Sequence, residues 1–185
     1  VVAVGAGRLA EMRISRRNQA YLLQNGGKPV TEPYFHVMVA FHSAVLVASV
    51  IEVIALNRPF IPVLGIAMLA IFIACTALRG WVIRTLAQHW NVQIMNSLDL
   101  GVVESGPYRY IRHPNYVAVY VELIAVPLIH TAVLTALIGA AIHLWILYHR
   151  IRVEESMLMT NEAYRAVMGS KPRFIPRLPK RSGSG

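Results

Sequence analysis

The sequence has few charged residues and a single cysteine. Charged residues make up 15% of its 185 residues, against roughly 25% in soluble globular domains, so a surface covered entirely by water is excluded. Disorder is excluded as well, because 56% of the residues are hydrophobic and disordered chains combine low hydrophobicity with high charge. Cys75 alone forms neither an intrachain disulfide nor a cysteine-based metal cluster.

Acidic residues and metal-binding patterns are also scarce. Nine Asp and Glu stand against 18 Lys and Arg, which gives a net charge of +9. In a soluble protein this excess would indicate a nucleic-acid partner. Here the apolar composition instead predicts an integral membrane protein with basic loops and without a nucleic-acid partner. The seven histidines show no H-E-x-x-H or other ligand spacing, so no metal is predicted.

Long apolar runs predict membrane-spanning helices. A span needs about 20 mostly apolar residues, and residues 37–56 and 60–78 supply one each, joined by a turn at 57–59 that ends in proline. The apolar run 117–148 is too long for one span and is expected to fold into a hairpin at 127–131. We therefore predict an all-α integral membrane protein with about four to five transmembrane helices.

The predicted organisation has five parts. They are the end of a truncated first transmembrane helix (1–7), a basic cytoplasmic segment (8–36), a transmembrane hairpin (37–79), a functional region that contains the second hairpin (80–181, hairpin 117–148) and a linker (182–185). Stretches 8–36, 79–115 and 149–185 hold five, four and eight of the 18 basic residues, and Arg58 alone lies opposite. The positive-inside rule predicts that these three stretches face the cytoplasm.

Two polar clusters flank the second predicted hairpin. The first contains Gly106-Pro107-Tyr108 and Arg112-His113-Pro114-x-Tyr116. Because proline suits the first position of a helix, Arg112 and His113 are expected at a helix N-terminus, where free N–H groups and the helix dipole favour an anion. An interfacial turn anchored by Tyr and Arg would have the same composition.

The second cluster follows the hairpin and combines two arginines with two acids. In a helix, Arg150 would share a face with Glu154, and Arg152 with Glu155. Two surface ion pairs are one interpretation of this spacing. The other is a functional site, because the cluster leaves the bilayer beside the first one and paired acids are unusual in so basic a chain.

In this order and membrane setting, the two clusters resemble the isoprenylcysteine carboxyl methyltransferase family, and the related phospholipid methyltransferases share much of the pattern. The resemblance covers about residues 84–176. The upstream run Arg16-Arg17-Asn18-x-x-Tyr21-Leu22-Leu23 is similar to a bacterial branch of the family often linked to type III polyketide synthases. The sequence departs from the pattern at Ala118, where glycine is frequent, and at 159–161, where a Phe-Gly pair is usual.

The resemblance implies transfer of a methyl group from S-adenosylmethionine to a lipophilic acceptor, either a small molecule or a prenylated one, among membrane lipids and without an obligatory protein partner. The implied cofactor-binding residues are Gly106, Tyr108, Arg112, His113, Pro114, Tyr116, Glu154 and Glu155. Arg150 and Glu154 are the implied catalytic residues, with Arg150 facing the acceptor. His113 or Glu154 would take a proton from a phenol or amine.

The nature of the acceptor atom follows from charge. A guanidinium near a cationic sulfonium favours an anion and opposes a cationic product, so Arg150 predicts an oxygen acceptor, which is a carboxylate or a phenolic or pyrone hydroxyl. Two other functions remain open at this stage. One is an NADPH-dependent reductase, since membrane sterol-type reductases resemble the family in their C-terminal half. The other is a non-catalytic membrane module with a basic, lipid-binding face.

Polar residues within the predicted spans have fewer assignments. Glu122 is either a functional intramembrane acid or the partner of His143 on the facing helix. Glu52 and His42 are expected to make interhelical hydrogen bonds or to lie near an interface.

Overall fold

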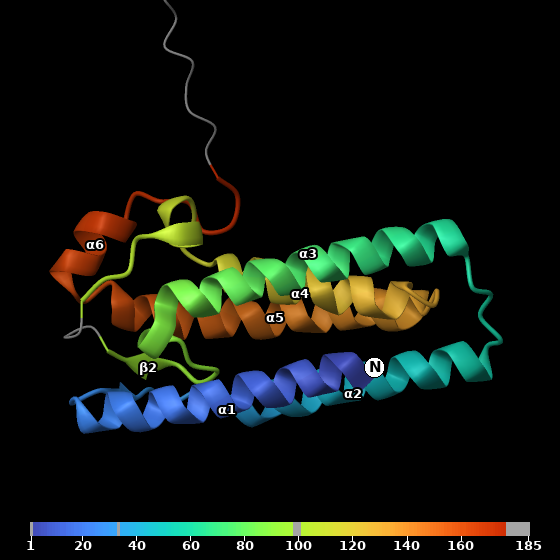
Figure 1. Ribbon diagram of the computed structural model, residues 1–185, viewed down its shortest axis with the longest axis horizontal. Helices are drawn as coiled ribbons and strands as arrows, with labels where there is room; N and C mark the ends of the chain where they lie inside the picture. Colours follow the sequence, from blue (N-terminus) through green and yellow to red (C-terminus); the bar gives the residue numbers. More distant parts are fainter. Residues whose placement is uncertain (1, 33, 98–100, 177–185) are drawn as a thin grey trace, which may run out of the picture.

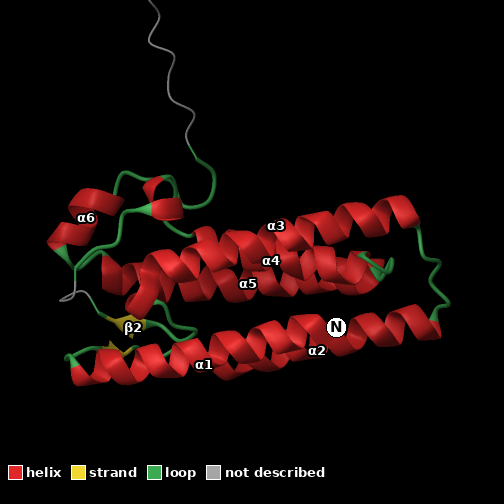
Figure 2. Cartoon of the chain, in the orientation of Figure 1, coloured by secondary structure: helices red, strands yellow, loops and turns green. Residues whose placement is uncertain are grey.

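The helices form two layers in the computed structural model, which describes residues 2–32, 34–97 and 101–176 (Figure 1). One layer contains α1 (Val2–Gln24) and α2 (Phe35–Ala55), and the other contains α3 (Pro62–Leu86), α4 (Pro114–Leu128) and α5 (Val133–Leu158). The short elements are β1 (Lys28–Pro29), η1 (Ala87–His89), β2 (Met95–Asn96), η3 (Gly106–Arg109) and α6 (Glu162–Met168). Figure 2 shows how little of the described chain is strand: β1 and β2 pair antiparallel, Lys28 with Asn96 and Pro29 with Met95.

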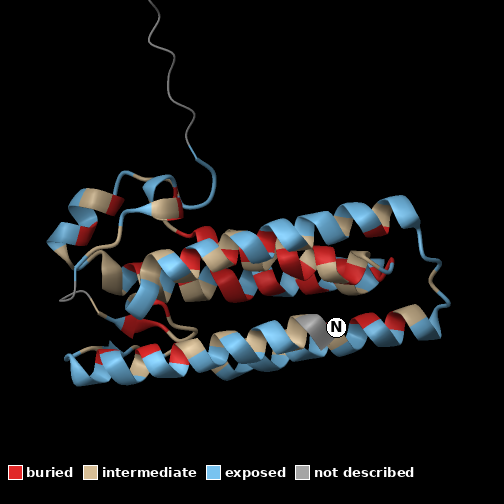
Figure 3. Cartoon of the chain, in the orientation of Figure 1, coloured by how far each residue is buried: buried red, intermediate tan, exposed pale blue. Residues whose placement is uncertain are grey.

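The long helices have the dimensions and surface of membrane spans. Among the described residues, α2, α3 and α5 are each long and apolar enough to cross a membrane. Their outer faces carry exposed large apolar side chains such as Val63, Ile66 and Leu137 (Figure 3), as a surface against lipid requires. At 15 residues, α4 covers only about 22 Å of a hydrocarbon core of about 30 Å. The prediction of an all-α integral membrane protein is confirmed.

Two tight turns lie together at one end of the bundle. Asn57, between α2 and α3, and Thr131, between α4 and α5, both have positive φ, at 46° and 58°. The Thr131 hydroxyl donates to the carbonyl of Pro59 at 2.5 Å, which ties the turns to each other. The hairpin predicted at 127–131 is confirmed, since α4 ends at Leu128, one residue beyond Pro127.

Glu52 links the first hairpin to the second. Its buried carboxylate accepts hydrogen bonds from the backbone N–H groups of Leu134 and Thr135, at 3.1 and 2.7 Å, and forms an ion pair with Arg58 at 2.8 Å. These N–H groups belong to the first turn of α5, whose N-cap Ala132 has no side-chain acceptor. An acid of α2 therefore caps α5. The interhelical hydrogen bonds expected of Glu52 are present.

An ion-pair cluster, formed by Arg8, Glu11, Arg79 and Glu122, holds α1 against α3 and α4. Arg8 lies 2.7 Å from Glu122, Arg79 Nε lies 3.1 Å from Glu11, and Arg79 lies 3.5 Å from Glu122. Of the two roles that the sequence left open for Glu122, the pairing with His143 is not formed, because two arginines, one of them from α1, surround this carboxylate instead.

The first predicted domain boundary, between residues 7 and 8, falls inside α1, which is one continuous helix. Arg8 and Glu11, at the start of the predicted cytoplasmic segment, contact Glu122 of α4 and Arg79 of α3. The predicted linker at 182–185 lies outside the described residues.

Replacing Glu52 tests its role as a cap. Glu52→Ala leaves the first N–H groups of α5 and the Arg58 guanidinium without their acceptor, so we expect Tm in detergent to fall by about 5 °C or more. Glu52→Gln retains an accepting oxygen, so its Tm should fall less than that of Glu52→Ala. Glu162→Gln, at an exposed carboxylate of α6, is the control and should leave Tm unchanged. Equal Tm values for all variants would contradict the assignment.

Candidate active site

A cavity of about 540 Å³ lies between the two layers. Its walls are largely apolar, with Val39 from α2, Leu123 from α4 and Leu147 from α5 among the lining residues. One end is polar, where residues of η3, of the start of α4 and of the C-terminal part of α5 line it. The cavity thus joins a polar end to a more apolar remainder, in which a few charged residues and histidines also lie.

Gly106 fixes the loop that leads into α4. Its φ is +56°, in the left-handed region that favours glycine. A Cβ atom there would lie 2.4 Å from Thr85 Oγ1 and 3.0 Å from Trp81 Nε1. Glycine is therefore required both by the backbone conformation and by the close packing of η3 on α3.

The C-terminal segment fixes the start of α4. The N–H groups of Arg112 and His113 donate to the carbonyls of Pro172 and Arg173, at 2.9 and 3.0 Å. His113 is the N-cap residue and Pro114 the first residue of α4, so the helix begins where the proline predicted.

Glu155 binds three cationic or hydrogen-bonding side chains from two other segments. Its carboxylate lies 3.0 Å from His113 Nε2, 3.2 Å from Arg112 and 2.5 Å from Arg173. Because Glu155 is buried and does not line the cavity, it stands behind His113 and Arg112 and orients them. The predicted pair of Arg152 with Glu155 is not formed in the described structure, where Arg152 donates to Tyr148 at 2.7 Å.

Tyr116 connects the two polar clusters. Its hydroxyl donates to Glu154 and accepts from Arg150 Nε, the latter at 3.0 Å. The Arg150 guanidinium lies 5.8 Å from the centre of the Tyr116 ring, and the His113 ring stacks on that ring at 5.3 Å. A tyrosine thus stands between Arg150 and Glu154, which sequence spacing alone predicted to pair directly.

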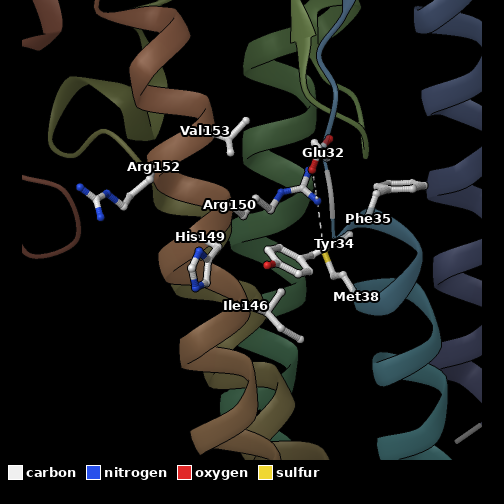
Figure 4. Close-up of a pocket in the computed structure, with 9 residues that line it drawn as sticks. All are labelled: Glu32, Tyr34, Phe35, Met38, Ile146, His149, Arg150, Arg152 and Val153. Carbon is white, nitrogen blue, oxygen red and sulfur yellow. Dashed lines mark hydrogen bonds and ion pairs between the residues drawn. The ribbon is translucent and has the colours of Figure 1, made fainter.

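Arg150 is anchored from the opposite layer. Figure 4 shows its side chain directed at Glu32, 3.0 Å away, and at Met38, whose sulfur lies 3.0 Å from Nη1, while Arg152 points the other way. Nη2 also donates to the carbonyl of Val92. Burial raises the pKa of the Glu32 carboxyl above its usual range, in spite of the opposing charge of Arg150.

The phenols at the polar end stay protonated. Burial raises the pKa of the Tyr108 and Tyr164 hydroxyls, and the negative charge of Glu154 raises both further. Each phenol is therefore available at neutral pH as a hydrogen-bond donor.

Several buried polar atoms around the cavity have no hydrogen-bond partner within the described residues. They include the donors Trp90 Nε1, Asn91 Nδ2 and Arg112 Nε and the acceptor Asn115 Oδ1. Buried polar groups are normally hydrogen-bonded, and all four residues line the cavity. This pattern fits a cavity built to enclose a polar ligand with both donors and acceptors.

The structure brings most of the predicted site residues to one wall. Those that line the cavity are Tyr108, Arg112, His113, Tyr116, Arg150 and Glu154. Gly106, Pro114 and Glu155 support this wall without lining it. Sequence reasoning missed Glu32 and Met38, whose isolated positions give no local motif, and Asn115, which lies between the motif residues Pro114 and Tyr116.

The comparison with known families agrees with this geometry. Residues 68–160 match the isoprenylcysteine carboxyl methyltransferase (ICMT) family. The chain belongs to this family. The match includes η3, α4 and all of α5, and therefore both polar clusters. As a member of the ICMT family with apolar helices long enough to span a bilayer, the protein is a membrane methyltransferase.

Two bacterial relatives extend the similarity. The chain is 29% identical over 152 residues to the uncharacterized protein YpbQ of Bacillus subtilis (strain 168), covering 82% of this chain and 89% of the relative. It is 33% identical over 152 residues to an uncharacterized protein of Haemophilus influenzae (strain Rd), covering 82% and 88%. The similarity between this chain and the two relatives therefore extends beyond residues 68–160 and covers most of the length of all three proteins.

The Gly106 packing yields a double-mutant prediction. Gly106→Ala should lower Tm, because it combines a positive φ with a clash against α3. Adding Thr85→Ala removes the nearest clashing atoms, so the double variant should recover part of the loss and retain the backbone strain and the close contact with Trp81 Nε1. Thermal unfolding of both single variants and the double variant measures this coupling. Strictly additive effects would show that η3 does not pack on α3 as described.

Proposed function

We propose that this ICMT-family protein transfers the methyl group of S-adenosylmethionine to an oxygen of a lipophilic acceptor at the cytoplasmic face of a bacterial inner membrane. The observation that carries the proposal is a cavity that Tyr108, His113, Tyr116 and Glu154 line at one polar end, and that apolar side chains such as Val39, Leu123 and Leu147 line elsewhere together with a few polar residues. A charged, water-soluble donor and an apolar acceptor need such a divided chamber in order to meet.

The residues at the polar end fit the cofactor. S-adenosylmethionine supplies a methyl group on a cationic sulfur, together with amino, carboxylate, ribose and adenine groups. The unpartnered donors Arg112 Nε, Trp90 Nε1 and Asn91 Nδ2 suit its carboxylate and ring acceptors, and Asn115 Oδ1 suits a donor. Glu154 supplies the negative charge that a cationic ligand needs.

His113 and Tyr116 form part of the proposed cofactor site at the polar end of the cavity. Their stacked rings form one surface beside Glu154, and an aromatic face attracts a cation. Glu155 keeps the His113 ring in place through its Nε2 atom, 3.0 Å away. Methyl transfer is a direct displacement, so alignment of the two reactants is the main contribution of these residues.

Arg150 borders the cavity next to this surface and is the proposed residue on the acceptor side. Its charge is balanced by Glu32, and its Nε is committed to Tyr116. The charge of Arg150 is therefore already paired before an acceptor enters. A neutral hydroxyl can enter without leaving the guanidinium unpaired. An oxygen acceptor on an apolar chain fits both Arg150 and the Val39, Leu123 and Leu147 walls.

Cofactor binding can be measured directly. Tyr116→Phe and Glu154→Gln each remove one polar contribution to the site, and we expect each to weaken binding of S-adenosylmethionine by about ten- to a hundredfold, the value of a charged hydrogen bond. Arg152 does not line this cavity, and its side chain points away from that of Arg150 (Figure 4), so Arg152→Gln should bind S-adenosylmethionine normally. Isothermal titration calorimetry of the purified protein provides the affinities. Wild-type affinity in both site variants would refute the cofactor assignment.

The orientation is tested by labelling single cysteines in intact cells. On a Cys75→Ala background, Tyr108→Cys and Arg152→Cys should resist a membrane-impermeant maleimide until the cells are opened. His130→Cys, at the opposite end of the bundle and exposed in the structure, should react at once. Reaction of positions 108 and 152 from outside would reverse the proposed topology.

A further inference from the structure

Two histidines line the same cavity beyond its polar end. His42 of α2 and His143 of α5 both line the cavity, and their ring centroids are 4.8 Å apart and nearly perpendicular. The His143 side chain is 1% exposed, and its ring stacks on those of Phe41 and Tyr120. The packing therefore holds this ring rigidly beside His42.

The histidine pair lies deeper in the bundle than Arg150. His42 follows Met38, which contacts Arg150, by four residues, or about 6 Å along α2. His143 precedes Arg150 by seven residues, or about 10 Å along α5. An apolar molecule that reaches Arg150 from within the bundle passes these two rings.

Hydrogen bonding fixes the tautomer of His42. Its Nδ1 lies 2.7 Å from the carbonyl oxygen of Met38. A carbonyl only accepts, so Nδ1 carries the hydrogen, and in the neutral ring Nε2 presents a lone pair. Nε2 is buried and has no partner among the described residues, and the same is true of both ring nitrogens of His143. The pair thus presents an uncommitted acceptor at His42 and a donor at His143.

The charged groups around this pair are committed to one another. Glu11 and Glu122 are engaged by Arg8 and Arg79, which reach them from α1 and α3. These two acids therefore already have cationic partners, whereas the His42 lone pair has none.

The two bases predicted from the sequence are committed as well. His113 Nε2 is bound to Glu155, and Glu154 accepts from Tyr116. Of these acceptors, His42 Nε2 is the one that is fully buried without a hydrogen-bond partner among the described residues.

We propose that His42 Nε2 is the proton acceptor for a hydroxyl-bearing acceptor, with the N–H of His143 holding the same oxygen. This inference rests on the proposed methyltransferase function. The acceptor O–H bond breaks and its proton moves to His42 Nε2. The oxygen forms a bond to the methyl carbon, and the carbon–sulfur bond breaks with its electron pair left on sulfur. The products are a methyl ether, a neutral thioether and a protonated imidazole, so atoms and charge balance.

This assignment narrows the acceptor class. A carboxylate is ionised at neutral pH and needs no base, and it has no hydrogen to donate to His42. A phenol or enol has an unperturbed pKa near 10, as tyrosine does, and must lose its proton to become a strong nucleophile. The uncommitted lone pair therefore favours a phenolic or enolic hydroxyl on an apolar chain over a fatty or prenylcysteine carboxylate.

The experiment compares three probes on the full chain in lipid nanodiscs with S-adenosylmethionine. The probes are 4-dodecylphenol, its ring-tetrafluorinated analogue and dodecanoic acid. The fluorinated phenol is already ionised at about pH 8, where the unsubstituted one is not. Wild-type protein should methylate both phenols. His42→Leu should lower kcat about 100-fold or more for 4-dodecylphenol, as loss of a general base does, and less than tenfold for the fluorinated phenol.

The controls separate chemistry from folding. His36→Leu changes an exposed histidine of the same helix and should behave as wild type, and calorimetry should show unchanged cofactor affinity in His42→Leu. Equal losses of kcat for the two phenols would assign His42 a structural role and overturn the inference. Full activity of His42→Leu would also overturn it. So would failure of the wild-type protein to methylate either phenol. Transfer to dodecanoic acid alone overturns the inference but keeps the methyltransferase. Failure of wild type to bind S-adenosylmethionine overturns the proposed function itself.

Discussion

The buried carboxylate of Glu155 joins three segments that are distant in sequence. It holds His113 and Arg112, which precede α4, and Arg173 from the segment after α6, and all of them meet on α5. A buried anion in this position needs cationic or hydrogen-bonding partners on every side. Supplying them brings the loop, α4 and the C-terminal segment to fixed positions around the polar end of the cavity. The placement of His113, and through it of Tyr116, depends on this one contact.

The same rule of local neutralisation organises the rest of the cavity. Arg150 is balanced by Glu32 from the opposite layer, and Arg79 by Glu11 and Glu122. In a membrane protein an unpaired charge away from water is strongly unfavourable. The result is a chamber in which the charged side chains hold one another in place. A ligand then meets a prearranged set of dipoles and hydrogen-bonding groups, and few side chains need to reorganise when it binds.

The features that the sequence predicted correctly are those that local chemistry decides. Pro114 marks the start of α4, Pro127 lies next to its end, and long apolar runs mark the spans. The cavity-lining residues Tyr108 to Tyr116 lie within one short motif, so their proximity follows from the chain itself. Glu154 is predicted beside them because it belongs to the second motif of the same family pattern.

The features that sequence reasoning missed are contacts between distant segments. No local pattern near Glu32 predicts its ion pair with Arg150, more than 100 residues away. No local pattern near Arg8 predicts its ion pair with Glu122. A pair between Glu122 and His143 was one of two possibilities for these residues on facing helices, but α1 and α3 supply arginines to Glu122 instead. The orientation of His42 was equally hidden, because it depends on one hydrogen bond to a backbone carbonyl.

The contact of α1 with α3 and α4 has a consequence for biosynthesis. Arg8 and Glu11 leave the ribosome long before Arg79 and Glu122, yet the four side chains neutralise one another only when all are in place. α1 is made before its partners and therefore has a docking site that is completed only after α4 has entered the bilayer. We expect α1 to join the bundle late, so that the cavity is closed on this side by a helix that is made earlier than α3 and α4 but docks after them.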